Sequence, residues 1–513
     1  MNVNGNKPLK IALIHPDLGI GGAERLVVDT ALGLQNEGNE VTIFTSHCDL
    51  THCFEEIKNG TLKYKVYGDH LPTSIKEKFF IVCSNLRQLY LLWKMYTTGQ
   101  LHHYDVFIVD QLSTCVPFIH SLTDAKILFY CHFPDQLLAQ RTSLLKRIYR
   151  VPFDLLEQFT ISAADEIVVN SNFTKQVYHK VFPYLTKVPY VIYPCVDINP
   201  EITDMSQIDN FDKKLYHMLV PQNMKYYLSI NRYERKKNIS LALKSFALSN
   251  EAVSNGYRLI IAGGYDSRVT ENVEYLKELE SVAQEYKLPF TTIKYQDLIN
   301  EKDEDPNDFD KIKIRNTDKV IFLTSISSRL RDYLIQNMEL LMYTPDNEHF
   351  GIVPLEAMRF GKPVLASNSG GPLETITSYH PNLNESTTTG WLRESNPSIW
   401  ATAINEYMEV KNQIDFNHNS REKVRKHFSS KVMSDSFEES IERIIQKERI
   451  QYPWETALAS IYYFSLHIAA LYLFPNQYWP YLILVGYAGI WRKNYFWACY
   501  YAFIIILFSM SLE

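Results

Sequence analysis

Residues 340–371 read LLMYTPDNEHFGIVPLEAMRFGKPVLASNSGG. A short apolar run, Leu340–Tyr343, is followed by a polar loop, by a helical segment that contains Glu356, and by a second apolar run, Pro363–Ala366. Short runs that are apolar without alternation are typical of parallel strands buried on both faces. The stretch therefore predicts a strand–loop–helix–strand unit of a doubly wound α/β domain.

The same alternation of apolar runs and helical patterns extends outward through most of the 513 residues, in two series. The first series predicts strands at Lys10–His15, Glu40–Thr45, Asp105–Asp110, Lys126–Cys131, Glu166–Asn170 and Tyr190–Tyr193. The second predicts strands at Tyr226–Ile230, Arg258–Ala262, Val320–Leu323, Leu340–Tyr343 and Pro363–Ala366. We expect two Rossmann-like domains that face each other across a cleft at the carboxyl ends of their strands.

Breaks in this pattern give the expected domain boundaries. We predict an N-terminal domain over 1–200, a polar linker over 201–222, a second domain over 223–430, a closing helix over 431–455 and a hydrophobic region over 456–513. The charged segment Leu298–Lys319 is interpreted as a surface insertion.

The C-terminal region predicts membrane spans. Thr456–Trp491 contains no Asp, Glu, Lys or Arg, and the apolar character resumes at Tyr495. Thr456–Phe474 and Tyr495–Leu512 each approach the roughly 20 residues that cross a bilayer, and the shorter Tyr478–Trp491 could make a third span or a re-entrant piece. A pair of buried core helices is the alternative, but aromatic residues at the segment ends favour a membrane interface.

Basic residues set the expected orientation. Arg443, Lys447 and Arg449 precede the first span, and Arg492-Lys493 follow the short one. The positive-inside rule then places the large N-terminal part in the cytosol. The four N-glycosylation sequons, at Asn59, Asn172, Asn238 and Asn384, are expected to carry no glycan.

Phe79–Tyr96 is a second lipophilic stretch. Its polar residues Ser84, Arg87, Gln88 and Lys94 recur at helical spacing. A helix with this narrow polar stripe can lie in a membrane interface, and a core helix is the alternative.

Composition excludes several functions. The net charge of −6 gives no support to nucleic-acid binding. Seven cysteines, without a C-x-x-C pair, indicate reduced thiols rather than a disulfide framework or a structural zinc site. Asp303-Glu304-Asp305 resembles a metal-binding Asp-x-Asp but falls in the polar insertion, so we expect it to be solvated.

Two motifs of the first series stand at carboxyl ends of predicted strands. Gly19-Ile20-Gly21-Gly22-Ala23-Glu24-Arg25 follows Lys10–His15, and strand, glycine loop and helix together can bind a phosphate; a purely structural glycine turn is the alternative. Glu24 occupies the place of the third glycine of a dinucleotide fingerprint, which excludes a nicotinamide site. His132 follows Lys126–Cys131 and could donate to a sugar hydroxyl or a phosphate; a structural histidine is the alternative.

Two motifs of the second series carry charge. Arg232 and Lys237 follow the strand Tyr226–Ile230, where two cations can clamp a diphosphate. Glu348 and Glu356 lie eight positions apart. The first can meet hydroxyls of a transferred sugar, and the second can accept the two ribose hydroxyls. Gly370-Gly371 form a loop able to approach phosphates.

These motifs, in this order, resemble the retaining glycosyltransferases of family 4, which have the GT-B fold and a Glu-x7-Glu signature matching Glu348 and Glu356. The resemblance covers nearly all of residues 9–445. The strings around Gly21, His132 and Glu348 are similar to the mannosyltransferases, of fungal type, that assemble the dolichol-linked oligosaccharide at the endoplasmic reticulum.

The resemblance implies transfer of α-mannose from GDP-mannose to a dolichyl-pyrophosphate-linked acceptor that carries one mannose on two N-acetylglucosamines, in α-1,3 and α-1,6 linkages. Arg232 and Lys237 would bind the diphosphate, Glu356 the ribose and Glu348 the mannose, with His132 beside the sugar. Gly21 and Gly22 would approach the reacting face. The implied donor site is further lined by Gly263, Gly264, His349, Phe350, Gly351, Gly370 and Gly371.

No metal, cofactor or covalent nucleophile is implied, and other mannosyltransferases of the pathway are possible partners. Two alternatives stay open. One is a family 4 enzyme with another nucleotide sugar or lipid acceptor, such as a phosphatidylinositol mannosyltransferase or an N-acetylglucosaminyltransferase. The other is an inactive GT-B scaffold at the membrane.

Overall fold

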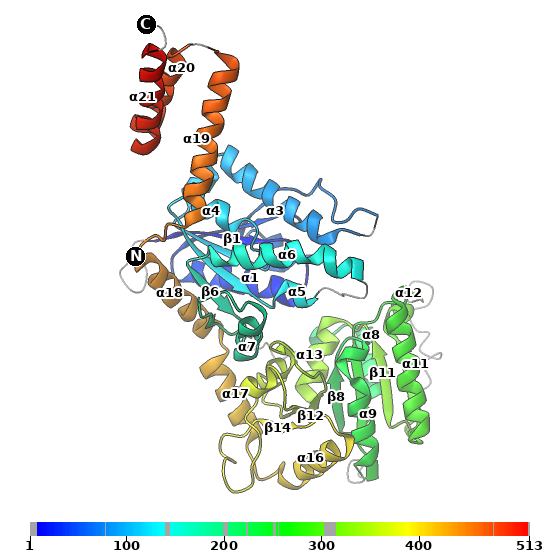
Figure 1. Ribbon diagram of the computed structural model, residues 1–513. Coiled ribbons are helices and arrows are strands. Elements are labelled where there is room, and N and C mark those ends of the chain that lie inside the picture. The colour runs from blue at the N-terminus through cyan, green and yellow to red at the C-terminus, as the bar shows by residue number, and fades with distance from the viewer. Residues whose placement is uncertain are drawn as a thin grey trace. The chain divides into compact units, whose positions relative to one another are not determined.

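The computed structural model describes residues 8–76, 78–138, 144–198, 204–221, 224–249, 253–254, 256–301, 314–475 and 477–510. The chain forms two compact units, Met1–Gln446 and Lys447–Glu513. The first unit contains two parallel sheets of seven strands each, with helices on their faces (Figure 1). This arrangement confirms the predicted GT-B architecture of two Rossmann-like halves.

The first sheet has the strand order β3-β2-β1-β4-β5-β6-β7. Its strands are β1 Lys10–His15, β2 Glu40–Thr45, β3 Lys63–Val66, β4 Val106–Asp110, β5 Lys126–Cys131, β6 Glu166–Val169 and β7 Tyr190–Val191. Its helices are α1 Gly22–Asn36, α2 Glu55–Lys58, α3 Phe80–Thr97, η1 Gln100–His103, α4 Val116–Leu122, α5 Asp135–Leu138, α6 Leu144–Ser162 and α7 Asn172–Val181.

The second sheet has the order β10-β11-β9-β8-β12-β13-β14. Its strands are β8 Tyr226–Ile230, β9 Arg258–Gly263, β10 Phe290–Lys294, β11 Val320–Thr324, β12 Leu340–Tyr343, β13 Val364–Ser367 and β14 Gly390–Arg393. Its helices are η2 Met205–Gln207, α8 Asn210–Leu219, η3 Arg235–Lys237, α9 Ile239–Leu248, α11 Thr270–Glu285, α12 Tyr295–Glu301, α13 Ser328–Asn337, α14 Ile352–Met358, α15 Pro372–Thr375, α16 Pro397–Val410 and α17 Phe416–His427.

The predicted strands are all present, with ends shifted by at most two residues. β3, β10 and β14 were not predicted, and each is an edge strand; β7, the other edge strand of the first sheet, was predicted. β3 alternates exposed and half-buried side chains, because an edge strand has no neighbour on one side. The continuous apolar run that marks a central strand is therefore missing at these positions.

The segment predicted as a linker, 201–222, contains a helix, α8. Asp209 caps it by accepting from the Asp212 backbone N–H at 2.7 Å. Phe211, Leu215 and Leu219 pack into the core of the second sheet. The helix was missed because these three apolar residues stand among many charges, which hides the helical period.

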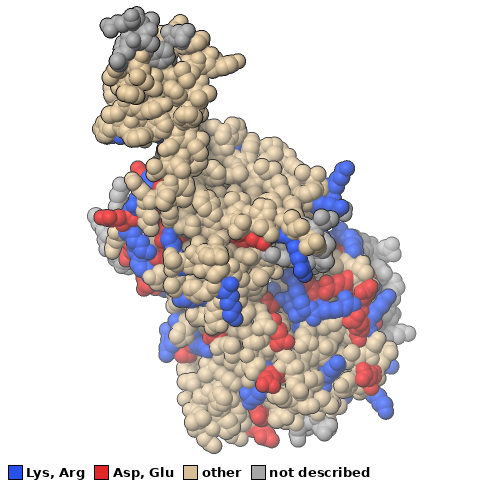
Figure 2. All heavy atoms as spheres, viewed as in Figure 1, with Lys and Arg blue, Asp and Glu red and all other residues tan. Residues whose placement is uncertain are grey.

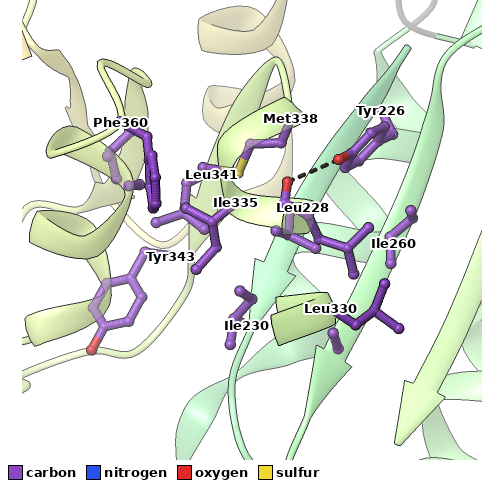
Figure 3. Close-up of a cluster of buried hydrophobic side chains, with 14 of the residues drawn as sticks. Tyr226, Leu228, Ile230, Ile260, Leu330, Ile335, Met338, Leu341, Tyr343 and Phe360 are labelled. Atoms are coloured by element: carbon purple, nitrogen blue, oxygen red, sulfur yellow. Dashed lines mark hydrogen bonds between the residues drawn. The ribbon is translucent and has the colours of Figure 1, made fainter. Parts of the chain in front are cut away.

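A core of aliphatic and aromatic side chains lies under β8, β9 and β12 (Figure 3). Tyr226 at its margin donates its hydroxyl to the backbone carbonyl of Leu334 at 2.8 Å. Tyr343, the last residue of β12, directs its hydroxyl away from the aliphatic side chains in Figure 3. The residues that follow β12 thus start from a rigid, fully buried strand.

The last helix of the first unit, α18 (Ser430–Gln446), returns to the first sheet. Its residues Met433, Phe437, Ile441 and Ile444 are buried in the same cluster as α1 and β1. Figure 1 shows α18 (orange) beside the blue and cyan elements of the first half. The second half is therefore tied to the first half at both of its ends.

Helix α3 buries part of the polar stripe noted in Phe79–Tyr96. Arg87 and Gln88 are buried and donate to the backbone carbonyls of Ser46 and Leu112. The apolar residues left exposed include Phe79, Phe80, Leu86, Trp93 and Tyr96. The polar residues point inward because loop carbonyls in the domain need donors.

The second unit is helical, with α19 Pro453–Leu473, α20 Trp479–Gly486, η5 Tyr487–Trp491 and α21 Tyr495–Met510. Within the described residues, α19 alone is both long and apolar enough to cross a membrane. The surface of the second unit is almost free of charged side chains (Figure 2). Tyr463, Tyr481, Trp497 and Tyr501 form its small aromatic core.

Candidate active site

Glu348 and Lys237 form the centre of the candidate site. They lie in the loops after β12 and β8, which are neighbours in the second sheet. Lys237 Nζ lies 2.5 Å from Glu348 Oε2, and the two side chains are 16% and 23% exposed. Thr344 Oγ1 donates to the Lys237 carbonyl at 2.6 Å, which ties the two loops together. The pair therefore places a cation and a carboxylate side by side at the surface.

The predicted glycine pair Gly370-Gly371 supports the loop that carries Glu348. A Cβ on Gly370, whose φ is +67°, would lie 2.4 Å from the Glu348 carbonyl oxygen. A Cβ on Gly371 would lie 2.1 Å from the Phe350 carbonyl oxygen. The Gly371 N–H donates to the Glu348 carbonyl at 2.8 Å. The pair therefore packs against the loop that carries Glu348, here called the donor loop, and its approach to phosphates stays a prediction.

Gly351 begins α14 at a φ of +80°, a conformation that favours glycine. A Cβ there would come within 3.2 Å of the Tyr343 hydroxyl. Burial, and then the charges of Glu348 and Glu356, raise the pKa of Tyr343. Tyr343 therefore stays a neutral phenol between the two glutamates.

Glu356, on α14, faces Arg331 of α13. Arg331 Nη2 lies 3.5 Å from Glu356 Oε1. Nothing around Arg331 in the sequence marks it as functional, and only the packing of α13 on α14 brings it to the signature. Burial lowers the pKa of its guanidinium, but the charges of Glu356 and Asp332 outweigh that effect and raise it. A permanent cation thus stands beside the predicted ribose ligand.

Arg232 is the most open of the predicted residues. Its side chain is 66% exposed, and Nη1 lies 3.3 Å from Glu234 Oε1. Gly264 lies against it, since a Cβ at Gly264 would come 3.1 Å from Arg232 Cγ. Gly263 approaches the backbone of Asn231 so closely that a Cβ would lie 1.9 Å from the Asn231 carbonyl oxygen. Arg232 does not join the Glu348–Lys237 pair among the described contacts.

His349 and Phe350 lie next to Glu348 and contact both halves of the first unit. The His349 ring stacks on Phe133, which follows His132 in the first half, with centroids 3.5 Å apart and planes 8° apart. Burial, against the opposing charge of Glu348 and with a smaller contribution from Lys237, lowers the pKa of His349 to about 4. His349 is therefore a neutral ring at neutral pH. Phe350 is buried and stacks on Tyr193.

Glu374, on α15, provides a second link between the halves. Its carboxylate accepts the backbone N–H groups of Asn172 and Phe173, at 2.8 and 2.9 Å, at the start of α7. The Tyr193 hydroxyl also donates to it at 2.8 Å. A carboxylate at a helix N-terminus is favourable, so this contact helps to hold the two halves together.

In the first half, His132 lies beside a buried carboxylate, with its Nε2 2.8 Å from Asp110 Oδ1. Gly21 is the N-cap of α1 and Gly22 its first residue. A Cβ at Gly21 would lie 2.2 Å from the carboxylate of Glu24, which folds back over it, whereas nothing lies within 4 Å of one at Gly22. The described contacts do not join Gly21 or Gly22 to the Glu348–Lys237 pair.

A hollow of about 730 Å³ lies elsewhere, along edge strand β3, and is lined by Thr42, Tyr64, Lys65, Gln100 and Tyr104 among others. None of the predicted site residues lines it. We place the site at the Glu348–Lys237 pair because complementary charges converge there. Asp303-Glu304-Asp305 lie outside the described residues. Within the described residues, no group of three or more His, Cys, Asp or Glu side chains could hold a metal ion.

Two family models match this chain. One, "Glycosyltransferase Family 4", matches residues 20–200, and the other, "Glycosyl transferases group 1", matches residues 213–427. The first covers most of the first sheet, and the second covers the second sheet together with the donor loop.

Curated relatives match over nearly the full chain. Alpha-1,3/1,6-mannosyltransferase ALG2 of Saccharomyces cerevisiae is 52% identical over 499 residues, covering 97% of each chain. The enzyme of the same name in Schizosaccharomyces pombe is 46% identical over 442 residues, covering 85% of this chain and 81% of the relative.

Solved structures show the same fold at low identity. Sucrose-phosphate synthase of Thermosynechococcus elongatus superposes with a TM-score of 0.60 at 18% identity, covering 85% of this chain and 99% of that one. Anabaena HepE in complex with UDP superposes with a TM-score of 0.57 at 17% identity, covering 85% and 100%.

Proposed function

This chain belongs to the family 4 glycosyltransferases, among the fungal α-1,3/1,6-mannosyltransferases of N-glycan precursor assembly, and we propose that its donor is GDP-mannose and its acceptor a dolichyl-pyrophosphate-linked Man1GlcNAc2. Mannose is added in α-1,3 and α-1,6 linkages, with retention at the anomeric carbon.

The Glu348–Lys237 pair is the observation that carries this proposal. A nucleotide sugar needs positive charge for its diphosphate and acceptors for its sugar hydroxyls. Lys237 and Glu348 supply both within 2.5 Å of each other. A charge-assisted hydrogen bond to a phosphate contributes about 1.5–3 kcal/mol. Lys237, together with Arg232 in the same loop after β8, then stabilises the nucleoside diphosphate as it departs.

No covalent enzyme intermediate is required. The bond between the mannose anomeric carbon and the β-phosphate oxygen breaks, and the acceptor hydroxyl oxygen bonds to the same carbon on the same face. The departing phosphate takes the hydroxyl proton. The protein's part is to hold donor and acceptor in place and to stabilise charge, which the residues above can do without a metal ion.

An inactive scaffold is disfavoured. A chain freed from catalysis has no need to keep complementary charges in its donor loop, yet the second half pairs Lys237 with Glu348 and Arg331 with Glu356. A different sugar or lipid acceptor is not favoured either, since the curated relatives with identities from 42% to 56% share one printed name.

We further propose that the enzyme works at the endoplasmic reticulum membrane with its first unit in the cytosol. α19 is long enough to span a bilayer. In the first half, α6 exposes Leu144, Ile148, Val151, Leu155 and Phe159 at spacings of three and four residues, which forms one apolar stripe. α3 adds exposed aromatic side chains, and a Phe79–Tyr149 ring contact joins this region to α6. A lipid-linked acceptor would then meet the first half at the membrane surface.

The test is a donor panel. Purified full-length protein in lipid vesicles receives a synthetic lipid-pyrophosphate chitobiose with one β-mannose, together with GDP-mannose, GDP-fucose, UDP-glucose or UDP-N-acetylglucosamine, in parallel reactions with and without EDTA. We expect two added mannoses from GDP-mannose and none from the others. Transfer from a UDP-sugar instead would overturn the donor assignment, and transfer that EDTA abolishes would overturn the metal-free mechanism.

A further inference from the structure

Asp110 lies between two histidines at the carboxyl ends of three adjacent strands in the first half. His15 ends β1, Asp110 ends β4, and His132 follows β5. Asp110 Oδ2 lies 2.6 Å from His15 Nδ1, and Asp110 Oδ1 lies 2.8 Å from His132 Nε2. His15 and Asp110 are 1% and 2% exposed, whereas the His132 side chain is 20% exposed.

The surroundings fix the charge of this cluster. Burial alone would lower the pKa of His15, but Asp110 and Glu24 raise it to about 9. Burial would raise the pKa of Asp110, but His132 and His15 lower it to about 2. Glu24 Oε1 lies 3.9 Å from His15 Nε2, an ion-pair distance. His15 is therefore a buried cation held between two carboxylates, and Asp110 stays ionised.

The geometry leaves one nitrogen of His132 for a ligand. Nε2 is buried and lies at an ion-pair distance, 2.8 Å, from Asp110 Oδ1, and neither atom has a hydrogen-bond partner among the described residues. An ionised carboxylate only accepts, so the proton of a neutral His132 stays on Nε2. Nδ1 then carries the lone pair.

We propose that Asp110, itself held by His15, is a positioning residue that fixes the ring and the tautomer of His132, so that Nδ1 accepts a hydrogen bond from a hydroxyl of the bound sugar. This assignment rests on the proposed function and names residues outside the family signature. It explains why one buried carboxylate contacts two histidines: His15 keeps Asp110 ionised and in place, and Asp110 in turn fixes the orientation of the His132 ring.

Asp110→Asn tests the tautomer with almost no change of shape. The Asn amide donates where the carboxylate accepted, so the proton of His132 moves to Nδ1 and the lone pair faces inward. We expect kcat to fall at least about tenfold, since one hydrogen bond made to the reacting sugar is lost. KM for GDP-mannose should stay within about twofold, because the Glu348–Lys237 pair lies in the other half.

A double-mutant cycle separates positioning from folding. In a His132→Gln background, Asp110→Asn should have no further effect on kcat, because Asp110 acts through His132. Glu166→Gln is the matched control: Glu166 is also buried in the first sheet but starts β6 and bonds to Arg443 at 2.9 Å, so its loss should leave kcat unchanged. If Asp110→Asn lowers kcat equally in both backgrounds, or no more than the control does, the proposal is overturned.

The tautomer itself can be seen by long-range ¹H–¹⁵N spectra of histidine-labelled enzyme with GDP bound, with the His132 signal assigned by its loss in His132→Gln. We expect Nε2–H in the wild type and Nδ1–H in Asp110→Asn. Nδ1–H in the wild type would contradict the proposal even if the cycle is non-additive. A wild type that transfers no mannose would instead overturn the proposed function and leave this spectral test standing.

Discussion

Gly371 acts on the donor loop by lacking a side chain. A methyl group there would lie 2.1 Å from the Phe350 carbonyl oxygen, and backbone cannot yield as a side-chain tip can. Gly371→Ala should therefore push the Glu348–Phe350 backbone away from Lys237 and cost about 1–3 kcal/mol of stability. We expect KM for GDP-mannose to rise severalfold and the Tm to fall.

Steady-state kinetics and calorimetry check this prediction. Gly486→Ala, on α20 of the second unit, serves as control, since nothing lies within 4 Å of a Cβ built at Gly486. A Gly371→Ala enzyme with unchanged KM and Tm would show that the donor loop does not depend on this contact.

Glu157 gives the first half a stability that depends on pH. It lies on α6 and accepts the backbone N–H groups of Asp135 and Gln136 at 2.7 and 3.2 Å, just after the His132 loop. Burial, with Asp135 nearby, raises its pKa from 4.5 to about 7. Between these values the folded protein holds a proton that the unfolded chain has released, so stability falls as pH rises through this window.

The comparison with Glu157→Gln isolates this effect, because glutamine does not titrate. The stability of the wild type relative to Glu157→Gln should fall by about 3 kcal/mol between pH 4.5 and pH 8. Thermal unfolding of both proteins in detergent at several pH values measures it. A difference that stays constant with pH would refute the raised pKa.

Sequence alone reached the site residues that lie in compact motifs, and the structure joins Glu348 with Lys237 and sets His349 beside them. The sequence alone did not identify Arg331 or Asp110 as site residues. Arg331 comes to Glu356 through the packing of two helices. Asp110 ends a predicted strand, but its two histidines stand 95 positions before and 22 after it, so only the strand order brings them together.

At the scale of elements, prediction found every central strand and the edge strand β7, but missed the other three edge strands. The central strands show continuous apolar runs, whereas β3, β10 and β14 lie at sheet edges. α8 was missed because Phe211, Leu215 and Leu219, its buried apolar side chains, stand among many charged residues. A strand buried on both faces shows a continuous apolar run in the sequence, which is easier to recognise than the alternating pattern of a strand buried on one face.

Helix α18 should matter for the first half although it follows the second in sequence. Phe437 is 1% exposed and stacks on Tyr130 of β5 with centroids 5.9 Å apart. Phe437→Ala should cost about 3–5 kcal/mol, because it leaves a cavity in that core. Chemical denaturation followed by tryptophan fluorescence measures the loss.

The control for this change is Ile445→Ala on the same helix, whose side chain is 43% exposed. It should cost under about 0.5 kcal/mol, as most surface substitutions do. Equal losses at the two positions would show that α18 does not pack as described.

At the scale of the whole molecule, the second unit is predicted to anchor the enzyme. Removing Lys447–Glu513 deletes α19 and leaves the first unit with its two sheets and α18 intact. We expect the shortened chain to keep binding GDP and to lose most of its association with lipid vesicles in flotation. Any residual binding should disappear when Phe80 and Trp93 of α3 are also changed to serine.

Should the shortened chain float as well as the full chain, and still do so after both serine substitutions, neither the second unit nor α3 is the anchor. Two exposed polar substitutions on α11, Glu274→Ser and Lys277→Ser, control for loss of folding in the doubly changed chain.

The measurement that tests the central claim most directly is linkage analysis of the products made by the wild type and by Glu348→Ala. Both enzymes receive GDP-mannose and the lipid-linked Man1GlcNAc2 acceptor, and GDP binding confirms that the variant is folded. If one site at the Glu348–Lys237 pair makes both bonds, the wild type adds α-1,3- and α-1,6-linked mannose and the variant loses both in parallel. Retention of either linkage at the wild-type rate would contradict the account.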